Sequence, residues 1–349
     1  MKHQLSNLLG ILLLIFLFSI SLSAQQNLAL PDASQHATVL QEVGLTEIKI
    51  DYHRPGVKDR LVWGTLVPYD QVWRAGANQN TTISFSNEIM IDGRKVPAGT
   101  YGLHMIPTEK EWTIILNKDF RAWGSFFYYE ANDQLRFKVK PQTANFQEWL
   151  LYTFDEVTPN SASVSLRWEK LRVPIKIEID LHRLMLDEMK QQLTGIPGFF
   201  WQGWNQAANY CYVNEIELEQ GLKWADRSIG INKNVANTFT KALILNALGK
   251  KDEASKLKEE AFINAQENDV NTFGYQLLNG GKIDDAIEIF KKNTELYPKS
   301  WNVWDSLAEG YMNKGEKQLA IENFTKALNM APENQHDRIK GTLKQLGAK

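Results

Sequence analysis

Residues 301–334, WNVWDSLAEGYMNKGEKQLAIENFTKALNMAPEN, carry the pattern that most constrains the fold of this chain. Aromatic and small residues recur there at helical spacing on both sides of a glycine. The positions concerned are Trp304, Leu307, Ala308 and Tyr311, then Gly315, then Ala320, Phe324 and Ala327, and finally Pro332. The spacing predicts two closely packed helices joined by a turn at Gly315. Because one such pair cannot bury its apolar face alone, the pattern also predicts neighbouring pairs.

The same register recurs upstream at a spacing of 34 residues, starting from Glu267. Six equivalent positions coincide there, namely Gly274, Leu277, Gly281, Ala286, Phe290 and Pro298. A third copy fits at a spacing of 32 residues with Ala242, Leu245, Gly249, Ala254 and Ala261. A fourth is degenerate, with Ala208, Tyr212, Gly221, Ala225 and Ser228, and with Asn232 at the proline position. The set resembles tetratricopeptide repeats and predicts an all-α solenoid of roughly four helix pairs over residues 199–349. The alternative is a helical bundle whose spacing arises by chance.

The N-terminus has the form of a secretory signal peptide. A basic start at Lys2 precedes an apolar run from Leu8 to Phe18 and small, weakly polar residues up to Ala24. The run is shorter than the roughly 20 residues that a membrane span needs. We expect cleavage of residues 1–24, export to the periplasm or the medium, and no stable membrane span afterwards. The alternative is an uncleaved membrane anchor.

The charge balance excludes a nucleic-acid-binding protein, and the cysteine content excludes a protein held together by internal disulfides. The chain has 39 Lys and Arg residues against 41 Asp and Glu residues, whereas a nucleic-acid-binding protein carries a clear basic excess. Cys211 is the single cysteine, so no internal disulfide forms. It lies between Tyr210 and Tyr212 with no basic residue close in sequence, which predicts a buried, inert thiol and not a nucleophile.

Between Pro31 and Asp180 the hydrophobic period changes from helical to two. Asp92-Gly93 between apolar runs is a hairpin signal. Roughly nine short strands are predicted, and they include residues 48–52, 83–85, 89–91, 99–105, 112–116, 135–139, 147–154, 164–168 and 173–179. They indicate an antiparallel β-sandwich or jelly-roll-like domain over residues 32–180. The strand 147–154 is apolar on both faces, which predicts a central place in its sheet.

One stretch of this domain, residues 56–80, does not alternate and is rich in Gly, Trp and Arg. Long connections inside compact domains are usually functional or packed. The recurring marks are Arg54-Pro55, Leu66-Val67-Pro68, the run from Trp73 to Asn78, AGTYGL ending at Leu103, and Trp123-Gly124. With these marks residues 32–180 resemble a family of secreted bacterial domains of unknown function, family 2911. The resemblance implies tetratricopeptide repeats behind the domain, as here, and no particular activity.

Histidines offer the first candidate for chemistry. The chain has none of the nucleophile elbows, phosphate-binding loops, HExxH helices, CxxC pairs or calcium loops that indicate a particular catalytic or binding function. His53 and His104 fall on predicted strands, each opposite its apolar neighbours. A cupin-like barrel would bring them together with a carboxylate such as Glu111 around a metal. The alternative is that both are solvent-facing or hydrogen-bonded, and we predict no metal and no cofactor.

A second candidate is a polar site in the long loop. Arg54, Trp73, Arg74 and Asn78 would together suit a carboxylate or sugar ligand. The alternative is structural, with the arginines pinning the loop by bonds to carbonyls and to Asp59 or Asp70. Four tryptophans present the same choice between a sugar-stacking platform and core packing, namely Trp63, Trp73, Trp112 and Trp123.

Residues 181–198 are predicted to form a linker helix that ends near Gly195, Pro197 and Gly198. The first solenoid helix follows, with Trp201 and Trp204 close together. Two tryptophans beside a domain junction favour docking onto the β-sandwich or the preceding helix. The alternative is that they line the groove of the solenoid.

The sequence therefore predicts an α+β chain of two domains, an N-terminal antiparallel β-sandwich followed by an all-α tetratricopeptide solenoid. We expect an exported, non-enzymatic binding or scaffold protein with a protein or peptide partner. The partner-binding candidates lie on the first helices of the last repeats, namely Tyr275, Asn302, Asp305 and Glu309. The alternative is a β-sandwich that binds a small ligand or carbohydrate, or acts as an enzyme, with the repeats as a docking arm.

Overall fold

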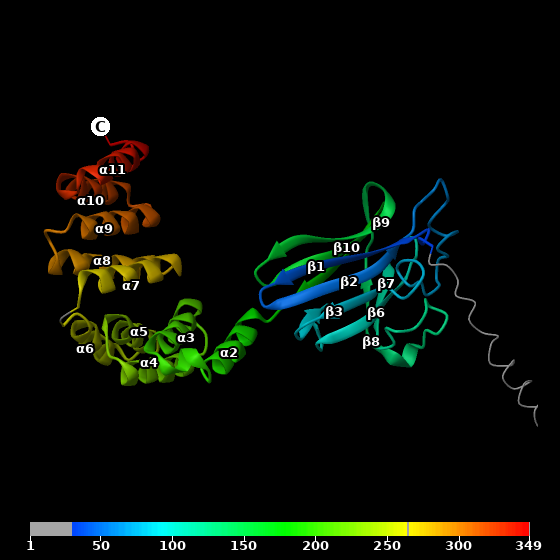
Figure 1. Ribbon diagram of the computed structural model, residues 1–349, viewed down its shortest axis with the longest axis horizontal. Coiled ribbons are helices and arrows are strands. Elements are labelled where there is room, and N and C mark those ends of the chain that lie inside the picture. Colours follow the sequence, from blue (N-terminus) through cyan, green and yellow to red (C-terminus); the bar gives the residue numbers. More distant parts are fainter. Residues whose placement is uncertain (1–29, 264, 349) are drawn as a thin grey trace, which may run out of the picture. The chain divides into compact units, whose positions relative to one another are not determined.

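A computed structural model describes residues 30–263 and 265–348. The chain divides into two compact units with the boundary between Leu181 and His182, and Figure 1 shows strands in the first and helices in the second. The predicted signal peptide, residues 1–24, lies outside the described residues. Within the described ranges, no helix is both long and apolar enough to cross a membrane.

The first unit is a sandwich of two antiparallel sheets, as predicted. A six-stranded sheet has the order β1-β2-β3-β6-β7-β8, and a four-stranded sheet has the order β5-β4-β10-β9. The strands of the larger sheet are β1 (Gln35–Val43), β2 (Thr46–Arg54), β3 (Thr82–Phe85), β6 (Gly99–Ile106), β7 (Trp112–Asn117) and β8 (Asp133–Val139). Those of the smaller sheet are β4 (Ile89–Ile91), β5 (Arg94–Val96), β9 (Gln142–Thr158) and β10 (Ser161–Glu178).

The predicted hairpin at Asp92-Gly93 is confirmed. Ile89 pairs with Val96 and Ile91 with Arg94, so β4 and β5 are joined by a two-residue turn. Both turn residues have positive φ, 52° at Asp92 and 68° at Gly93. Asp-Gly suits such a turn because its backbone twist matches that of the two strands.

Aromatic side chains fill the space between the two sheets. Trp112 of β7 and Trp168 of β10 are both buried, and the ring of Trp63 lies 4.8 Å from the first and 5.6 Å from the second. Trp73 stacks on Trp168 at 5.9 Å. The long loop therefore inserts two indoles into the core, which keeps residues 56–80 in place without secondary structure.

Three predictions about strands were wrong. The segment 147–154 is not central, because β9 lies at the edge of its sheet. Its outer side is covered by the long loop, where Val57 N donates to Glu148 O at 2.9 Å and Leu150 N donates to Pro55 O at 3.0 Å. This cover explains an edge strand that is apolar on both faces.

The other two errors concern strand number. The predicted strands 164–168 and 173–179 are one strand, β10, because the polar residues between them form a bulge at Glu169 with φ of 53°. Strand β1 was missed because it is an edge strand with mostly polar, solvent-facing side chains. Strand β5 follows the predicted hairpin and is not among the nine predicted ranges, so the described residues contain ten strands.

The second unit consists of ten α-helices in its described residues. They are α2 (Leu181–Gln192), α3 (Trp201–Asn214), α4 (Leu218–Ile231), α5 (Val235–Ala247), α6 (Lys251–Ala261), α7 (Glu267–Asn279), α8 (Ile283–Leu296), α9 (Trp301–Lys314), α10 (Lys317–Met330) and α11 (Glu333–Gln345). Four successive pairs, α3–α4 to α9–α10, correspond to the four predicted repeats, and α11 follows as a last helix (Figure 1). Gly315 makes the predicted turn with φ of 83°.

Small residues bring the paired helices together, as the sequence pattern requires. A Cβ at Gly274 of α7 would lie 2.3 Å from the Phe290 ring of α8, and one at Gly310 of α9 would lie 3.3 Å from the same ring. Phe290 is fully buried. Its ring is therefore held between the first helices of two successive repeats and joins those repeats in one core.

The linker region and Cys211 agree with their sequence patterns. Helix α2 covers residues 181–192, and a short 3-10 helix at Ile196–Phe199 precedes α3. Trp204 Nε1 donates to Gly198 O at 2.9 Å, so this indole docks on the segment before its own helix. Cys211 is buried and free, and burial raises the pKa of its thiol to about 11. At neutral pH the sulfur is a protonated thiol, which is a poor nucleophile.

Candidate functional site

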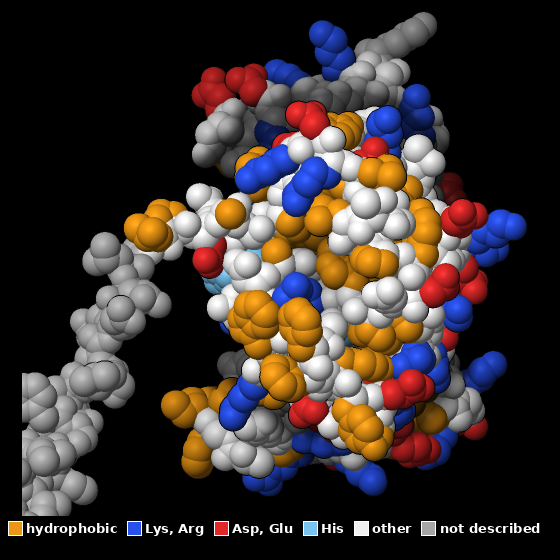
Figure 2. Space-filling model, turned by 90° about the vertical axis from the view of Figure 1, so that its right-hand side faces the viewer, with side chains coloured by type: hydrophobic (Ala, Val, Ile, Leu, Met, Phe, Trp, Pro, Cys, Tyr) orange, Lys and Arg blue, Asp and Glu red, His pale blue; other side chains and the backbone are white. Residues whose placement is uncertain are grey.

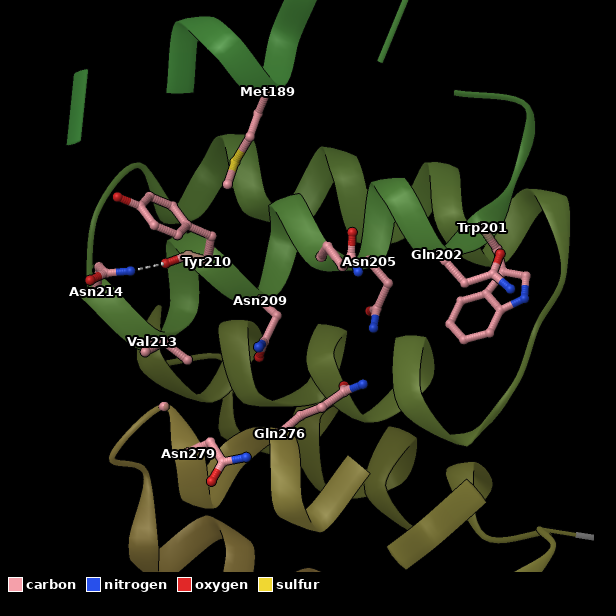
Figure 3. A pocket seen from close by; sticks show the side chains of 12 residues that line it. Met189, Trp201, Gln202, Asn205, Asn209, Tyr210, Val213, Asn214, Gln276 and Asn279 are labelled. Carbon is pink, nitrogen blue, oxygen red and sulfur yellow. Dashed lines mark hydrogen bonds between the residues drawn. The ribbon is translucent and has the colours of Figure 1, made fainter. Parts of the chain in front are cut away.

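Many uncharged polar side chains line one hollow on the solenoid. Helix α3 presents a stripe at helical spacing, and α2 and the C-terminal end of α7 complete the walls (Figure 3). The lining residues are Met189, Trp201, Gln202, Asn205, Gln206, Asn209, Tyr210, Val213, Asn214, Gln276, Asn279 and Gly280, around a volume of about 460 Å³. We call this hollow the amide groove.

Seven of the twelve lining residues are Asn or Gln, and none of the described residues that line it is charged. Asn205 Oδ1 and Asn209 Oδ1 are buried and lack a hydrogen-bond partner within the part of the chain that the structure describes. A buried amide oxygen without a partner costs about 1–3 kcal/mol. The groove therefore offers acceptors that a ligand's N–H groups could satisfy.

Amide side chains are suited to a peptide backbone. Each Asn or Gln carries an oxygen acceptor and a nitrogen donor, which match the N–H and C=O of one peptide unit. Trp201, Tyr210, Val213 and Met189 add apolar surface between the amides. The alternative prediction, that an aromatic of α3 lines the groove, therefore holds for Trp201, while Trp204 docks on Gly198.

The predicted partner-binding residues lie further along the solenoid and are engaged with one another. Tyr275 of α7 donates from its hydroxyl to Glu309 Oε2 of α9 at 2.8 Å. Asn302 Nδ2 donates to Glu267 Oε1 at 3.3 Å. Asp305 accepts from Arg338 of α11 at 2.8 Å. These bonds link the first helices of successive repeats.

The partner-binding prediction is wrong for Asp305, because the side chain of this residue is buried, with an exposed fraction of 5%, and is not accessible to a partner. Burial raises the pKa of the Asp305 carboxyl against the opposing effect of Arg338. Burial also raises the pKa of Glu309. The spacing of residues on a helix gave no sign of the ion pair between Asp305 and Arg338 of α11, because that contact joins positions 33 residues apart.

In the β-unit, the four ligand-binding candidates do not form one site. Arg54 Nε donates to Leu150 O at 2.9 Å and borders a hollow with Ala33, Gln35 and Trp149. Arg74 borders a different hollow, with Val72, Trp73, Ser125 and Phe126. The two arginines are separated because Arg54 ends β2 beside β9, whereas Arg74 lies at the far end of the long loop.

The loop arginines bond to carbonyls, as the structural alternative predicted. Arg74 Nη1 donates to Asn78 O at 2.7 Å. Arg60 donates to Gly56 O at 2.6 Å and to Val57 O at 3.0 Å. Asn78 Nδ2 in turn donates to Ser34 O at 3.2 Å, and Trp73 Nε1 donates to Gly76 O at 3.1 Å. No bond to Asp59 or Asp70 is found within the described ranges.

The tryptophans divide between the two predicted roles. Trp63, Trp73 and Trp112 belong to the aromatic core described above. Trp123 instead has an exposed fraction of 54% and stacks on Phe126 with ring centres 5.8 Å apart. Only Trp123 of the four is therefore placed as a surface platform.

The two candidate histidines do not converge on a metal site. Among the described residues, no three His, Cys, Asp or Glu side chains gather closely enough to hold a metal ion. His53 on β2 is buried 5.2 Å from the His36 ring, and burial lowers its pKa. His104 on β6 is buried and its Nδ1 lies 3.0 Å from Ser125 Oγ. The prediction that they face solvent is wrong, while hydrogen bonding holds for His104.

His104 leads to a pH prediction. Burial lowers its pKa from 6.5 to about 4, which corresponds to about 3 kcal/mol. Between these values the unfolded chain binds a proton that the folded chain does not. The β-unit should therefore lose stability as the pH falls from 6.5 towards 4. His104→Gln should remove about 3 kcal/mol of that loss, measured by denaturant-dependent hydrogen exchange at β6 and β7. An unchanged pH dependence in the variant would contradict the assignment.

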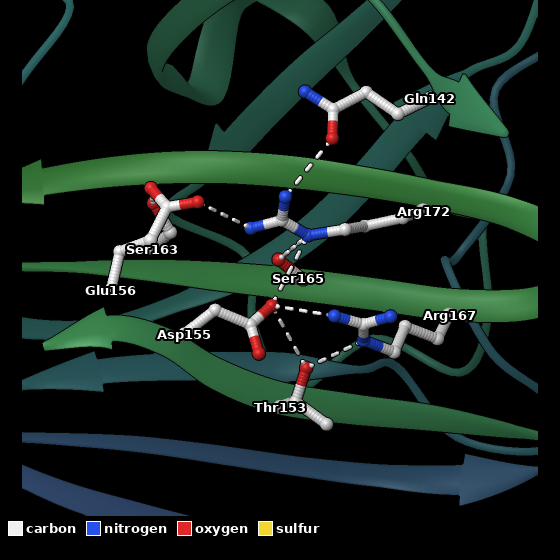
Figure 4. Close-up of polar contacts among 8 residues, drawn as sticks. All are labelled: Gln142, Thr153, Asp155, Glu156, Ser163, Ser165, Arg167 and Arg172. Carbon is white, nitrogen blue, oxygen red and sulfur yellow. Dashed lines mark hydrogen bonds and ion pairs between the residues drawn. The ribbon is translucent and has the colours of Figure 1, made fainter. Parts of the chain in front are cut away.

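A charged cluster on β9 and β10 is fully paired and is structural. Asp155 accepts from Arg167 and from Arg172, each at 3.1 Å, and Arg172 also contacts Glu156 at 3.2 Å (Figure 4). Burial would raise the pKa of Asp155, but hydrogen bonds from Ser165 and Arg167 outweigh it and lower the pKa. Since its charges satisfy one another, the cluster holds the two long strands in register.

The sequence interpretation missed the amide groove, although a signal was present. Gln202, Asn205, Gln206 and Asn209 recur at spacings of three and four in α3. That spacing places them on one helix face. Such a stripe offers both donors and acceptors, but the neighbouring aromatic residues favoured an interpretation of α3 as a docking helix.

The comparisons agree with this architecture. Residues 34–177 match a family described as a protein of unknown function, DUF2911, and residues 302–334 match a tetratricopeptide repeat. The predicted resemblance and the order of the two parts are confirmed.

Individual relatives and solved structures match part of the chain. Human Superkiller complex protein 3 is 33% identical over 61 residues, which are 18% of this chain and 4% of that protein. Of the solved structures, YrrB, a tetratricopeptide-repeat protein with an unusual peptide-binding site, is 19% identical over 46% of this chain and 83% of its own, with a TM-score of 0.25. A repeat protein from Cytophaga hutchinsonii is 18% identical over 42% of this chain and 58% of its own, with a TM-score of 0.23.

Proposed function

We propose that this chain is an exported, non-enzymatic scaffold protein whose solenoid binds an extended segment of a partner protein in the amide groove. The observation that carries the proposal is the pair of buried, unpartnered oxygens of Asn205 and Asn209 among further amides and aromatics. A solenoid of stacked repeats offers such an extended surface. Side chains without charge favour recognition of the backbone over recognition of a charged motif.

The shape of the groove supports a peptide more than a compact ligand. Its amides follow α3 from Gln202 to Asn214 and continue on α7 at Gln276 and Asn279. Successive amides four residues apart on a helix are about 6 Å apart along its axis. A peptide in extended conformation repeats its side-chain direction every two residues, about 6.6 Å. The two spacings are close enough for several backbone groups to be engaged at once.

A double variant tests the groove. Asn205→Leu with Asn209→Leu should weaken binding of peptides selected from a random displayed library by about tenfold or more, because two hydrogen bonds of about 0.5–1.5 kcal/mol each are lost. The melting temperature should not fall, since the oxygens removed have no partner in the described residues. Fluorescence anisotropy with the selected peptides measures the effect.

Asn246→Leu is the matched control, because Asn246 is exposed on α5 and does not line the groove. It should leave peptide affinity within about twofold. Equal affinities of the double variant and the wild-type chain would refute the proposed groove. The other three candidates of the last repeats, Tyr275, Asn302 and Glu309, remain a prediction. It is tested by Asn302→Ala, which removes the part-buried hydrogen bond to Glu267 and should weaken peptide binding if these residues contact the partner.

Export rests on the sequence of residues 1–24. We expect the mature chain to begin after Ala24, because a basic start, a short apolar run and small residues stand in the order that signal peptidase requires. Intact mass spectrometry of the chain recovered from the cell envelope or the medium measures this. Retention of Met1–Ala24 in that fraction would contradict the expectation.

A further inference from the structure

The guanidinium of Arg74 is a half-buried cation without an anionic partner. Nη1 donates to Asn78 O at 2.7 Å, and no Asp or Glu forms an ion pair with it in the part of the chain that the structure describes. Burial alone lowers the pKa of Arg74. An arginine carries five N–H donors in a planar fork, so donors remain for a further acceptor.

A segment some fifty residues further along the chain leaves space for the Arg74 guanidinium at Gly124. A Cβ at Gly124 would lie 2.4 Å from Arg74 Nη1 and 3.1 Å from Cζ, and Gly124 has φ of 61°. Glycine is therefore needed there both for the backbone conformation and for the space that the guanidinium occupies. The Trp123-Gly124 pair is thus explained by its contact with Arg74.

Aromatic rings enclose the same group. Cζ of Arg74 lies 5.5 Å from the Trp123 ring centre and 5.9 Å from that of Phe126. Trp123, Phe126, Phe127 and Tyr129 are all largely exposed. Figure 2 shows one face of the β-unit, where hydrophobic side chains are exposed at many points, with Lys and Arg side chains among them.

A small hollow opens beside the guanidinium. It has a volume of about 200 Å³ and is lined by Val72, Trp73, Arg74, Ser125 and Phe126. We call it the Arg74 pocket. The Ser125 hydroxyl bonds to His104 Nδ1 at 3.0 Å, which fixes its place at the wall and leaves it further hydrogen-bonding capacity.

We propose that the Arg74 pocket binds the carboxylate of a small acid whose remaining part is apolar. A single guanidinium fork matches the two oxygens of one carboxylate. Val72, Trp73 and Phe126 provide the apolar walls for the rest of the ligand. The volume is below the about 300–1,000 Å³ of pockets for drug-sized ligands, which indicates a ligand of one ring or one side chain.

Phenylacetate and phenylacetamide are the probes that test the proposal on the whole chain. They have the same ring and differ in the charge of the group that would face Arg74. Isothermal titration calorimetry should show binding of phenylacetate and at least tenfold weaker binding of phenylacetamide. Equal binding of the two would overturn the proposal, as would tighter binding of inorganic phosphate or of glucuronate than of phenylacetate.

A pair of arginine variants tests whether Arg74 is the residue that binds the carboxylate. Arg74→Gln should weaken phenylacetate binding at least tenfold, while Arg121→Gln, which alters an exposed arginine of the same segment, should stay within twofold. Gly124→Ala should also weaken binding, because its methyl group would displace the guanidinium. Undiminished binding by Arg74→Gln would overturn the proposal. If Arg74→Gln does not fold, the comparison of phenylacetate with phenylacetamide on the wild-type chain still decides it.

The Arg74 pocket and the amide groove lie in different units, so the result for one proposal does not decide the other. The titration with phenylacetate does not involve the solenoid, and the peptide measurement does not involve Arg74. Loss of one binding activity in a variant of the other unit would contradict this independence.

Discussion

Replacing Phe290 with alanine is expected to lower the free energy of unfolding of the solenoid by about 3–5 kcal/mol. Phe290 is fully buried, and its ring lies against Gly274 and Gly310 of two successive first helices. Its ring centre also lies 5.2 Å from that of Tyr275. The truncation would leave a cavity where two repeats meet, so stability should be lost in both.

Urea unfolding followed by helical circular dichroism measures this effect. Phe199→Ala is the matched control, because Phe199 has an exposed fraction of 77% and should change the free energy of unfolding by no more than about 0.5 kcal/mol. A loss below about 1 kcal/mol in Phe290→Ala would show that the repeats do not share the core described here.

Replacing Trp168 with alanine is expected to destabilise the β-unit by a similar amount, about 3–5 kcal/mol. The indole is buried, stacks on Trp73 at 5.9 Å and donates from Nε1 to Glu148 O at 3.2 Å. Because Trp73 belongs to the long loop, the same change should also loosen residues 56–80.

Hydrogen exchange resolved along the chain measures both consequences at once. Protection should fall in β9 and β10 and at Trp73 N, which donates to Met105 O at 2.8 Å. Trp123→Ala is the control, because that indole is exposed and lies outside the aromatic core. If Trp123→Ala costs as much stability as Trp168→Ala, the division between core and surface tryptophans is wrong.

The repeats were predictable from the sequence because their contacts are local and periodic. Gly274 and Phe290 recur 34 residues later as Ala308 and Phe324, and each repeat is packed mainly against its neighbours. The pattern therefore specifies both the helices and their pairing. The contact of Arg338 with Asp305 is not part of the repeat, so no periodicity revealed it.

Strand order was less predictable, because it depends on pairing between distant segments. Alternation identified β2, β3, β6 and β7, but it gave no means of deciding whether 147–154 lies inside or at the edge of its sheet. The deciding contact is the bond of Val57 N to Glu148 O, which joins a loop to a strand. Strand β1 was missed since an edge strand needs few apolar residues.

The candidate sites show the same limit. Arg74 was identified from its place between Trp73 and Gly76 in an irregular, glycine-rich loop. Its partners Gly124, Ser125 and Phe126 could not be identified from the sequence, because no sequence pattern relates residues 72–78 to residues 123–126. The amides of α3 were visible as a helical stripe, but only the structure shows that Asn205 and Asn209 leave oxygens unpartnered within the described residues.

The central claim, that the solenoid holds its partner in the amide groove, is tested most directly by photo-crosslinking from single positions. A benzophenone side chain is placed at Gln206, which is exposed and lines the groove, or at Leu61, which is exposed in the long loop of the β-unit. After irradiation of the whole chain with a peptide selected from the random library, mass spectrometry identifies the crosslinked position. The account predicts a crosslink from position 206 and none from position 61. A crosslink from position 61 alone would assign recognition to the β-unit and contradict the account.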